Sequence, residues 1–220
     1  MDTSGAPDEG RDWIRFVSDL HHRLKNNLQT LVSVINLQAS RTTDPNVGRA
    51  IRTIQNRVRA IAGVFGNDST PDLAMVHFGS YLTSLVRDLA AEYAISHRVE
   101  IQITAADMAV GIDKAIPLAL IANELAANAL EHAFGERERG KVSVTLSYER
   151  EPFGTADALG YAILDVIDDG VPLPGEWGSG AGEATGLYLV KTLTSQLRGQ
   201  FNVQESSSGK RFRVRFPLEP

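Results

Sequence analysis

The stretch HHRLKNNLQT, residues 21–30, combines side chains that suit phosphoryl transfer. An exposed imidazole can act as a nucleophile, and neighbouring cations and amides can orient phosphate oxygens and stabilise their charge. The plainer interpretation is a solvated helix face with one half-buried histidine. A zinc site is disfavoured, because the stretch holds neither cysteine nor carboxylate and adjacent helical side chains diverge by about 100°.

Helical periodicity separates the two histidines. Apolar residues recur at steps of three and four, which predicts an amphipathic helix with the stripe Trp13, Val17, Leu20, Leu24, Leu28, Leu31 and Ile35. On the helical wheel His22 lies about 160° from the centre of this stripe, and His21 lies about 60° from it. His22 is therefore predicted to face solvent and His21 to flank the packed face. Lys25, Asn26 and Gln29 are predicted to share the exposed face of His22.

A second group of polar residues lies in IANELAANALEHAF, residues 121–134. Glu124, Asn128 and His132 stand at i, i+4 and i+8, a single line along an otherwise apolar helix. Polar groups among apolar neighbours need partners. A metal ion held by Asn128 together with phosphate oxygens would supply them, and Glu124 could position or activate a group beside it. The alternative, an exposed face, does not explain the surrounding apolar residues.

Two further segments point to a nucleotide. The strand-like YAILDVIDDG, residues 161–170, ends with Asp168, whose carboxylate can accept a hydrogen bond from an exocyclic amine such as that of adenine. Gly170 allows the backbone to approach closely. GSGAGEATGLYLV, residues 178–190, passes from a glycine-rich loop into a helix, whose amides can hold phosphates. The three segments together, in this order, predict a nucleotide site.

Two amphipathic helices must position the histidine cluster. The first stripe ends at RTTDPNVG, residues 41–48, where Asp44-Pro45 signals a turn and Asn46 can cap the following helix. A second stripe then comprises Val47, Ile51, Ile54, Val58, Ile61 and Phe65. The pattern predicts an antiparallel helical hairpin, which would pair with a second copy into a four-helix bundle.

The second half alternates between helical and strand patterns. Helices are predicted at about 78–95, 113–133 and 187–197, and strands at 99–104, 141–148, 161–168, 200–205 and 211–217. Helices on one face of a mixed sheet make an α/β sandwich, so the fold class is α+β with an N-terminal hairpin. The predicted domains are a disordered segment 1–10, a hairpin 11–67 and a sandwich 73–220.

Composition limits the cellular locations and the classes of binding partner to be expected. The net charge of −5 provides no overall basic field for nucleic acid or anionic lipid. The sequence has no cysteine, no signal peptide and no apolar run of the ~20 residues that cross a bilayer. We therefore expect a cytoplasmic protein without a membrane or nucleic-acid partner. The chain is expected to be either a stand-alone protein or the core of a longer one, and Met1 and the compact ending favour the first.

These motifs resemble the HisKA_2 group of histidine kinases, relatives of the HWE kinases. Their phosphoacceptor motif His-Arg-x-x-Asn stands here at 22–26, within HHRLKNNLQ. The likeness continues through the N box NELAANALEHAF, the G1 box DDGVP, the G2 region ATGLYLV and the strand pair FNVQESSSGKRFRVRFP, so it covers about residues 15–217. It implies a dimerisation and histidine-phosphotransfer hairpin followed by a Bergerat-type ATP-binding domain of the GHKL class.

The resemblance also implies residue roles. His22 would be the phosphorylated histidine, supported by Arg23, Lys25 and Asn26. Glu124 would be the acidic catalytic residue of the N box, and Asn128 would bind ATP and ligate Mg²⁺. The other implied ATP-binding residues are His132, Asp168, Gly170, Gly182, Thr185, Gly186 and Leu187. The implied reaction is ATP-dependent phosphorylation of His22, followed by transfer to an aspartate on the receiver domain of a response regulator.

Three positions depart from the family pattern. Pro172 and Ala184 stand where the G1 and G2 patterns usually have glycine, and Glu131 stands where the N box often has lysine. Proline removes an amide donor and stiffens the chain, and an inward-facing Glu131 would repel a triphosphate. Two alternatives to the ATP-dependent kinase follow. One is a phosphotransferase that relays phosphoryl groups between response regulators through His22. The other is a non-catalytic module that binds a receiver domain.

Overall fold

The structure is a computed structural model of the whole chain. It describes residues 9–66, 75–93, 99–134, 139–149, 160–171, 185–207 and 209–218, and the side chains of residues 9–14, 132 and 185 lie outside this description. A helical N-terminal region is followed by a domain with a mixed sheet, which confirms the predicted fold class. The predicted domain boundaries at 10, 67 and 73 stay predictions.

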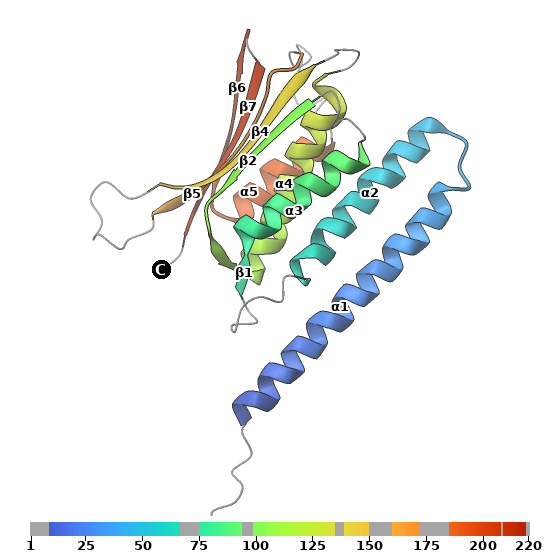
Figure 1. Cartoon of the computed structure of the whole chain (residues 1–220), viewed down its shortest axis with the longest axis vertical. Coiled ribbons are helices and arrows are strands. Elements are labelled where there is room, and N and C mark those ends of the chain that lie inside the picture. The colour runs from blue at the N-terminus through green and yellow to red at the C-terminus, as the bar shows by residue number, and fades with distance from the viewer. Residues whose placement is uncertain are drawn as a thin grey trace, which may run out of the picture.

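The N-terminal region is a hairpin of two helices, α1 (Glu9–Ala39) and α2 (Pro45–Val64) (Figure 1). Asp44 caps α2, since its side chain accepts a hydrogen bond from the Asn46 amide at 2.8 Å. Pro45 takes the first helical position, where its missing N–H costs nothing. The cap is thus Asp44, two residues before the predicted Asn46. The helices are linked across the seam by Gln55 Nε2, which donates to Asn36 Oδ1 at 2.6 Å.

The two apolar stripes of the hairpin are only partly covered. Leu28 and Ile35 are half-buried, whereas the exposed large apolar side chains of α1 and α2 are Phe16, Leu20, Leu24, Leu31, Val34, Leu37, Val47 and Ile54. We call these eight residues the exposed apolar face. The hairpin alone therefore buries only part of each stripe, as expected for two helices that would pair with a second copy. Two helices have too little facing surface to bury two wide stripes.

The second domain contains a five-stranded sheet of order β2-β4-β5-β7-β6. β2 pairs with β4 in parallel, and the other neighbours are antiparallel. The strands are β2 (Val99–Ala105), β4 (Gly140–Glu149), β5 (Tyr161–Asp168), β6 (Gln200–Ser206) and β7 (Gly209–Pro217). They agree with the predicted strands to within about two residues. The sequence analysis missed a two-stranded pair, β1 (Met75–His77) and β3 (Ala109–Gly111), because three-residue strands leave little periodicity.

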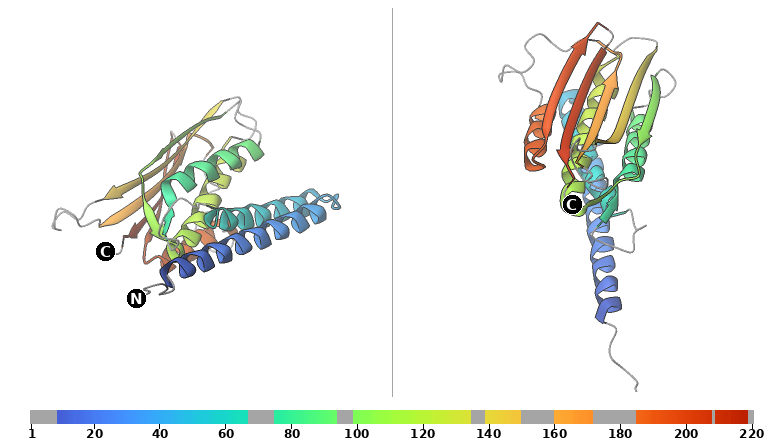
Figure 2. Two further views of the ribbon diagram at one scale, coloured as in Figure 1. Left: turned by 60° about the horizontal axis from the view of Figure 1, so that its bottom comes forward. Right: turned by 90° about the vertical axis from the view of Figure 1, so that its left-hand side faces the viewer.

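Three helices cover one face of this sheet: α3 (Phe78–Glu92), α4 (Ile112–His132) and α5 (Thr185–Gln196) (Figures 1 and 2). Strand residues of alternate phase, among them Val144, Leu164 and Phe212, are buried beneath the helices. α4 contributes the largest share of this core, with Leu118, Ile121 and Leu125 fully buried. No helix among the described residues is both long and apolar enough to cross a membrane.

The hairpin packs against the α/β domain through α2. In Figure 1, α2 lies between α1 and the pair α3 and α4. The buried positions of α2 are small or polar, namely Gln55, Asn56, Ala60, Ala62 and Val64. Tyr81 of α3 donates its hydroxyl hydrogen to the Ala60 carbonyl at 2.8 Å. Burial raises the pKa of this tyrosine strongly, so it remains a donor. α2 is therefore a shared element of both parts of the chain.

Gly209 provides a test of the junction between β6 and β7. Its φ is +132°, and an added Cβ would lie 2.0 Å from the Asp168 carbonyl oxygen. Gly209→Ala should therefore lower the free energy of unfolding by about 1–3 kcal/mol or more. Gly48→Ala is the matched control, since Gly48 is helical and its added Cβ meets atoms only at 3.8 and 3.9 Å. For Gly48→Ala the free energy of unfolding should rise by about 0.5–1 kcal/mol. Chemical denaturation measures both, and equal effects would contradict the expectation.

Candidate nucleotide and phosphotransfer site

The N-box residues lie on α4, the helix that contributes most to the buried core of the domain. Asn123 and Glu124 are 1% and 5% exposed, although both are polar. Asn128 is half-buried. Its amide nitrogen is buried and has no hydrogen-bond partner among the residues that the structure describes. Buried polar groups are normally paired, so this amide points to a missing ligand. His132 ends α4, and its side chain lies outside the described residues.

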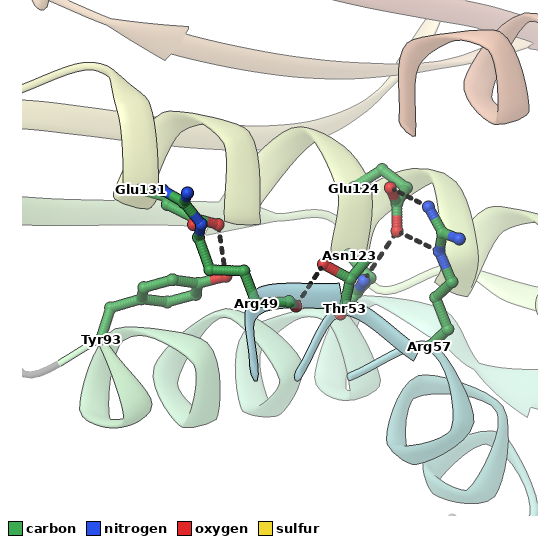
Figure 3. Close-up of polar contacts among 7 residues, drawn as sticks. All are labelled: Arg49, Thr53, Arg57, Tyr93, Asn123, Glu124 and Glu131. Atoms are coloured by element: carbon green, nitrogen blue, oxygen red, sulfur yellow. Dashed lines mark hydrogen bonds and ion pairs between the residues drawn. The ribbon is translucent and has the colours of Figure 1, made fainter. Parts of the chain in front are cut away.

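The hairpin provides the partner of Glu124. Arg57 of α2 forms a two-pronged ion pair with this carboxylate, with Nε to Oε1 at 2.9 Å and Nη2 to Oε2 at 2.8 Å (Figure 3). Asn123 Nδ2 also donates to Oε1, at 3.2 Å. The hydrogen bond to Glu124 raises the pKa of Arg57 above its ordinary value. The sequence analysis did not identify Arg57, because nothing in a sequence pairs a helix arginine with a glutamate 67 residues away.

The G1 segment lies against the C-terminal end of α4. The Val171 amide donates to the Ala133 carbonyl at 2.8 Å, and a Cβ on Gly170 would lie 2.1 Å from the same oxygen. Residue 170 must therefore be glycine for β5 to meet α4 this closely. The contact places the end of β5, with Asp168, beside the N-box helix. Pro172 lies outside the described residues.

Asp168 is fully buried, and its two carboxylate oxygens differ in their hydrogen bonding. Oδ1 receives a hydrogen bond from the Gly170 amide at 3.0 Å and an ion pair from Lys210 Nζ at 3.0 Å. Lys210 Nζ also donates to the Val171 carbonyl. Oδ2 is buried without a hydrogen-bond partner within the described part of the chain. Burial raises the pKa of Asp168, and the hydrogen bond and charge of Lys210 oppose that shift.

Lys210 is a site residue that the sequence analysis overlooked, although a signal existed. Along β7 the buried positions alternate as Lys210, Phe212, Val214 and Phe216. A lysine in phase with three buried apolar residues should have a buried anionic partner. Asp168 has the same phase on β5, and the register places these two residues opposite each other.

The start of α5 completes this region. A Cβ on Gly186 would lie 2.5 Å from Glu124 Oε2 and 3.9 Å from Asn128 Nδ2, so the first turn of α5 meets the N box. Leu187 is buried in the core beneath it. A cavity of about 350 Å³ between α2 and α4 includes Arg57, Glu124, Asn128 and Gly186. Gly182, Ala184 and the side chain of Thr185 lie outside the described residues.

Glu131 lies at the exposed side of the cavity that also includes Asn128. It is exposed and accepts a hydrogen bond from the Tyr93 hydroxyl at 3.3 Å (Figure 3). Burial and the nearby Glu131 raise the pKa of Tyr93 strongly, so this hydroxyl remains a donor. Solvent screens the Glu131 charge, so the repulsion considered from sequence is weak.

The histidine pair behaves as the helical wheel predicted. His22 is exposed, whereas His21 is half-buried and packs edge-on against Phe65, with ring centroids 5.6 Å apart. His21 therefore helps to seat α1 on the end of α2. His22 projects from the opposite side of the seam and is accessible to another molecule.

The neighbours of His22 are less uniform than predicted. Asn26 and Gln29 are exposed. Arg23 is exposed and pairs with Asp19 through a contact of 2.9 Å. Lys25, in contrast, is half-buried, and its Nζ would lie 3.0 Å from a Cβ on Gly66. The prediction that Lys25 shares the exposed face of His22 was wrong, because α1 turns this position toward the end of α2.

The structure brings the residues of the nucleotide motifs together, but it leaves His22 apart from them. Glu124, Asn128 and Gly186 meet at α4, and Asp168 and Gly170 lie against the end of the same helix. His22 lies on α1, and α2 separates α1 from α4 (Figure 1). The arrangement can hold a nucleotide within the α/β domain while His22 remains exposed to solvent.

Two family models match the chain. The HisKA_2 model, described as histidine kinase, matches residues 19–93. The second model, described as histidine kinase-, DNA gyrase B-, and HSP90-like ATPase, matches residues 113–220. The first covers the helices with the histidine pair, and the second covers α4, the G1 segment and β7.

Curated relatives and a solved structure agree with these matches. "Sensor histidine kinase PdtaS" of Mycobacterium tuberculosis is 28% identical over 86% of this chain and 36% of that protein. "Blue-light-activated histidine kinase 2" of Erythrobacter litoralis is 25% identical over 99% of this chain and 61% of that protein. The chain thus spans less than two thirds of either relative.

The histidine kinase domain of an Erythrobacter litoralis blue-light activated histidine kinase has the same fold. Its structure superposes with a TM-score of 0.68 at 24% identity, over 96% of this chain and 95% of that one. The arrangement of a helical hairpin before an α/β domain is therefore shared. Taken with both family models, these matches show that the chain belongs to the histidine kinase family, with a HisKA_2 segment followed by an HSP90-like ATPase domain.

Proposed function

We propose that the chain is an ATP-dependent protein histidine kinase that phosphorylates His22 and passes the phosphoryl group to an aspartate of a response-regulator receiver domain. One observation carries the nucleotide half of this proposal. Asp168 Oδ2 and Asn128 Nδ2 are buried polar atoms without partners among the described residues, and both belong to the nucleotide motifs. The exposure of His22 carries the phosphotransfer half.

The side chains suit the parts of an adenine nucleotide. Asp168 Oδ2 would accept a hydrogen bond from the exocyclic amine of adenine. Asn128 would face the phosphates with its amide, and its oxygen is the kind of ligand that Mg²⁺ prefers. The described residues contain no cluster of three or more His, Asp or Glu that could hold a metal ion. The proposed Mg²⁺ would therefore depend on Asn128 together with phosphate oxygens, whose charge it would neutralise.

The reaction is a displacement at the γ-phosphorus. A ring nitrogen of His22 attacks phosphorus and forms an N–P bond, while the bond to the β,γ-bridging oxygen breaks and ADP leaves with that electron pair. The imidazole loses its remaining ring proton to a base, and Glu124 is the proposed acceptor. In the second step a receiver carboxylate attacks the same phosphorus, and His22 leaves and regains a proton.

Labelling with radioactive ATP tests the kinase. Wild-type protein with Mg²⁺ should acquire an acid-labile label, and His22→Ala should acquire none, because the nucleophile is gone. Asn128→Ala should reduce labelling by roughly a hundredfold or more, since a preorganised phosphate contact is lost. His21→Ala should retain most of the label, because His21 packs against Phe65.

The same assay separates the alternative functions. A protein that gains no label from ATP, but gains it at His22 from a phosphorylated receiver domain, is a phosphotransferase and not a kinase. Loss of both reactions, with a receiver domain still bound, would leave the non-catalytic module. A labelled His22→Ala protein would overturn the assignment of the nucleophile.

The Asp168–Lys210 pair predicts how nucleotide binding depends on pH. Asp168 must be ionised to accept from adenine, and its raised pKa should weaken binding on acidification earlier than for an ordinary aspartate. Lys210→Met removes a charge that lowers this pKa, so the acid limb of the affinity profile should move to higher pH. In the pH range where binding begins to fall, the nucleotide affinity of Lys210→Met should be roughly tenfold weaker than that of wild type. The two affinity profiles should converge at higher pH.

Fluorescence titration with an ATP analogue between pH 5 and 9 would measure these profiles. Lys141→Met is the control, because its ammonium pairs with Glu100 at 3.1 Å and is not among the groups that shift the pKa of Asp168. Thermal unfolding should be recorded alongside, since Met leaves Asp168 without its buried counter-ion. A profile unchanged by Lys210→Met in a folded protein would contradict the assignment.

We further propose that the exposed apolar face joins two copies of the chain. It contains large aliphatic side chains from both α1 and α2, and such patches on soluble proteins mark interaction sites. Burying it against its own copy would complete a four-helix bundle of hairpins. Family membership supports the same assembly.

A charge at the centre of this face should separate the copies. Leu31 is 52% exposed, so Leu31→Asp should leave the fold of one chain intact but bury an unpaired carboxylate in the dimer. Sedimentation should show a dissociation constant at least about a hundredfold weaker than that of wild type. Gln29→Asp, exposed and about 200° around α1 from Leu31, should remain dimeric. A monomeric wild type would refute the assembly.

A further inference from the structure

One ion pair ties the hairpin directly to the N box. Arg57 fills both oxygens of Glu124, and Asn123 adds a third hydrogen bond to Oε1 (Figure 3). An ionised carboxylate has about four lone-pair positions, so three of them are occupied. A carboxylate in this state has little capacity left to accept a proton from a reacting group.

The first turn of α5 crowds Glu124 from another direction. It approaches Oε2 so closely that a Cβ on Gly186 would lie 2.5 Å from it. Glu124 itself is 5% exposed. The carboxylate therefore offers little free surface to a reacting group while Arg57 and α5 stay in these positions.

The helix that provides Arg57 also keeps the phosphoacceptor helix at a distance. α2 lies between α1 and α4, and Ala60 and Val64 of α2 are buried against the domain (Figure 1). His22 is on α1, whose inner side faces α2 at the contact between His21 and Phe65. The arrangement that occupies Glu124 is thus the same one that holds His22 away from it.

The hairpin contacts the α/β domain partly through ion pairs and hydrogen bonds, which can break and re-form. Among the described residues, its polar links to the domain include the Arg57–Glu124 pair, the Arg59–Glu92 pair at 2.6 Å and the hydrogen bond from Tyr81 to Ala60. The Arg57 side chain keeps 23% of its surface exposed, so water and ions can compete for it. Polar contacts between parts of one chain permit relative movement more readily than a large apolar seam does.

We propose that Arg57 is a positioning residue that holds Glu124 out of the reaction, so that the hairpin must leave α4 before phosphoryl transfer. The proposal rests on the proposed kinase function. When Arg57 withdraws, two positions on the carboxylate open and the cavity beside Asn128 widens toward the hairpin. The position of α2 then decides whether the N-box acid is available. The Asp168 end of the site, which has no contact with Arg57, is unaffected.

The experiment compares three variants of the full chain. Arg57→Gln removes the charge and the fork, and Arg57→Lys keeps the charge but loses the two-pronged geometry. Arg59→Gln is the matched control, because it removes an equal charge from the same helix and the same interface but releases Glu92, not Glu124. Initial rates of autophosphorylation are measured against ATP concentration, and the affinity for a non-hydrolysable ATP analogue is measured separately.

Arg57→Gln should raise the maximal rate by between about fivefold and a hundredfold, the usual range of coupling between two sites. The rise in rate should exceed any change in analogue affinity, because Arg57 lines the cavity beside Asn128 and has no part in base recognition at Asp168. Arg57→Lys should fall between Arg57→Gln and wild type, and Arg59→Gln should raise the rate less than Arg57→Gln, because Arg57 still occupies Glu124. A rate that is unchanged or lower in Arg57→Gln overturns the proposal. An equal rise in Arg59→Gln would show that general loosening of the interface, and not Glu124, is responsible.

Hydrogen exchange separates failure of this proposal from failure of the kinase proposal. Backbone amides of residues 53–64 and 121–128 should exchange faster in Arg57→Gln than in Arg59→Gln, with or without ATP. If no variant is labelled but the exchange difference is present, the kinase function fails and the coupling between Arg57 and the N box stands. If exchange is the same in both variants, the coupling fails whatever the labelling shows.

Discussion

The burial of Glu124 in α4 is the constraint on which the rest of the structure depends. α4 packs against the sheet on one side and against the hairpin on the other, so Asn123 and Glu124 have almost no access to bulk water. A buried carboxylate needs a cation or several donors. Arg57 of the hairpin provides them, and this requirement fixes how α2 lies on the domain. The small residue Ala60 on α2 then permits the close approach of the two helices.

Much of the fold could be predicted from sequence because the signals were periodic. β7 alternates through four buried positions, and α4 is apolar over most of its length. The face of α2 against the domain could not be predicted, because Gln55, Asn56 and Ala60 are less apolar than the stripe that remains exposed. Hydrophobic pattern finds the most apolar face of a helix. It cannot tell whether that face meets its own chain or another copy.

The same distinction holds at the site. Residues recognised by local motif, such as Asn128 and Asp168, were predicted, and His22 was separated from His21 by helical geometry alone. Arg57 and Lys210 were missed because each acts through a partner distant in sequence, 67 residues away for Arg57 and 42 for Lys210. Lys210 at least shares the phase of the buried strand residues. Arg57 has no such mark, since arginine on a helix is ordinarily solvated.

The two ends of the candidate site are therefore built from different parts of the chain. The end that would recognise the base is built within the α/β domain, where Lys210, Gly170 and Asp168 hold one another regardless of the hairpin. The end that would face the phosphates includes Arg57, which belongs to the hairpin. A movement of the hairpin can therefore alter the chemistry at Glu124 without changing how the base is held. A kinase built in this way can retain its nucleotide while the hairpin determines when that nucleotide reacts.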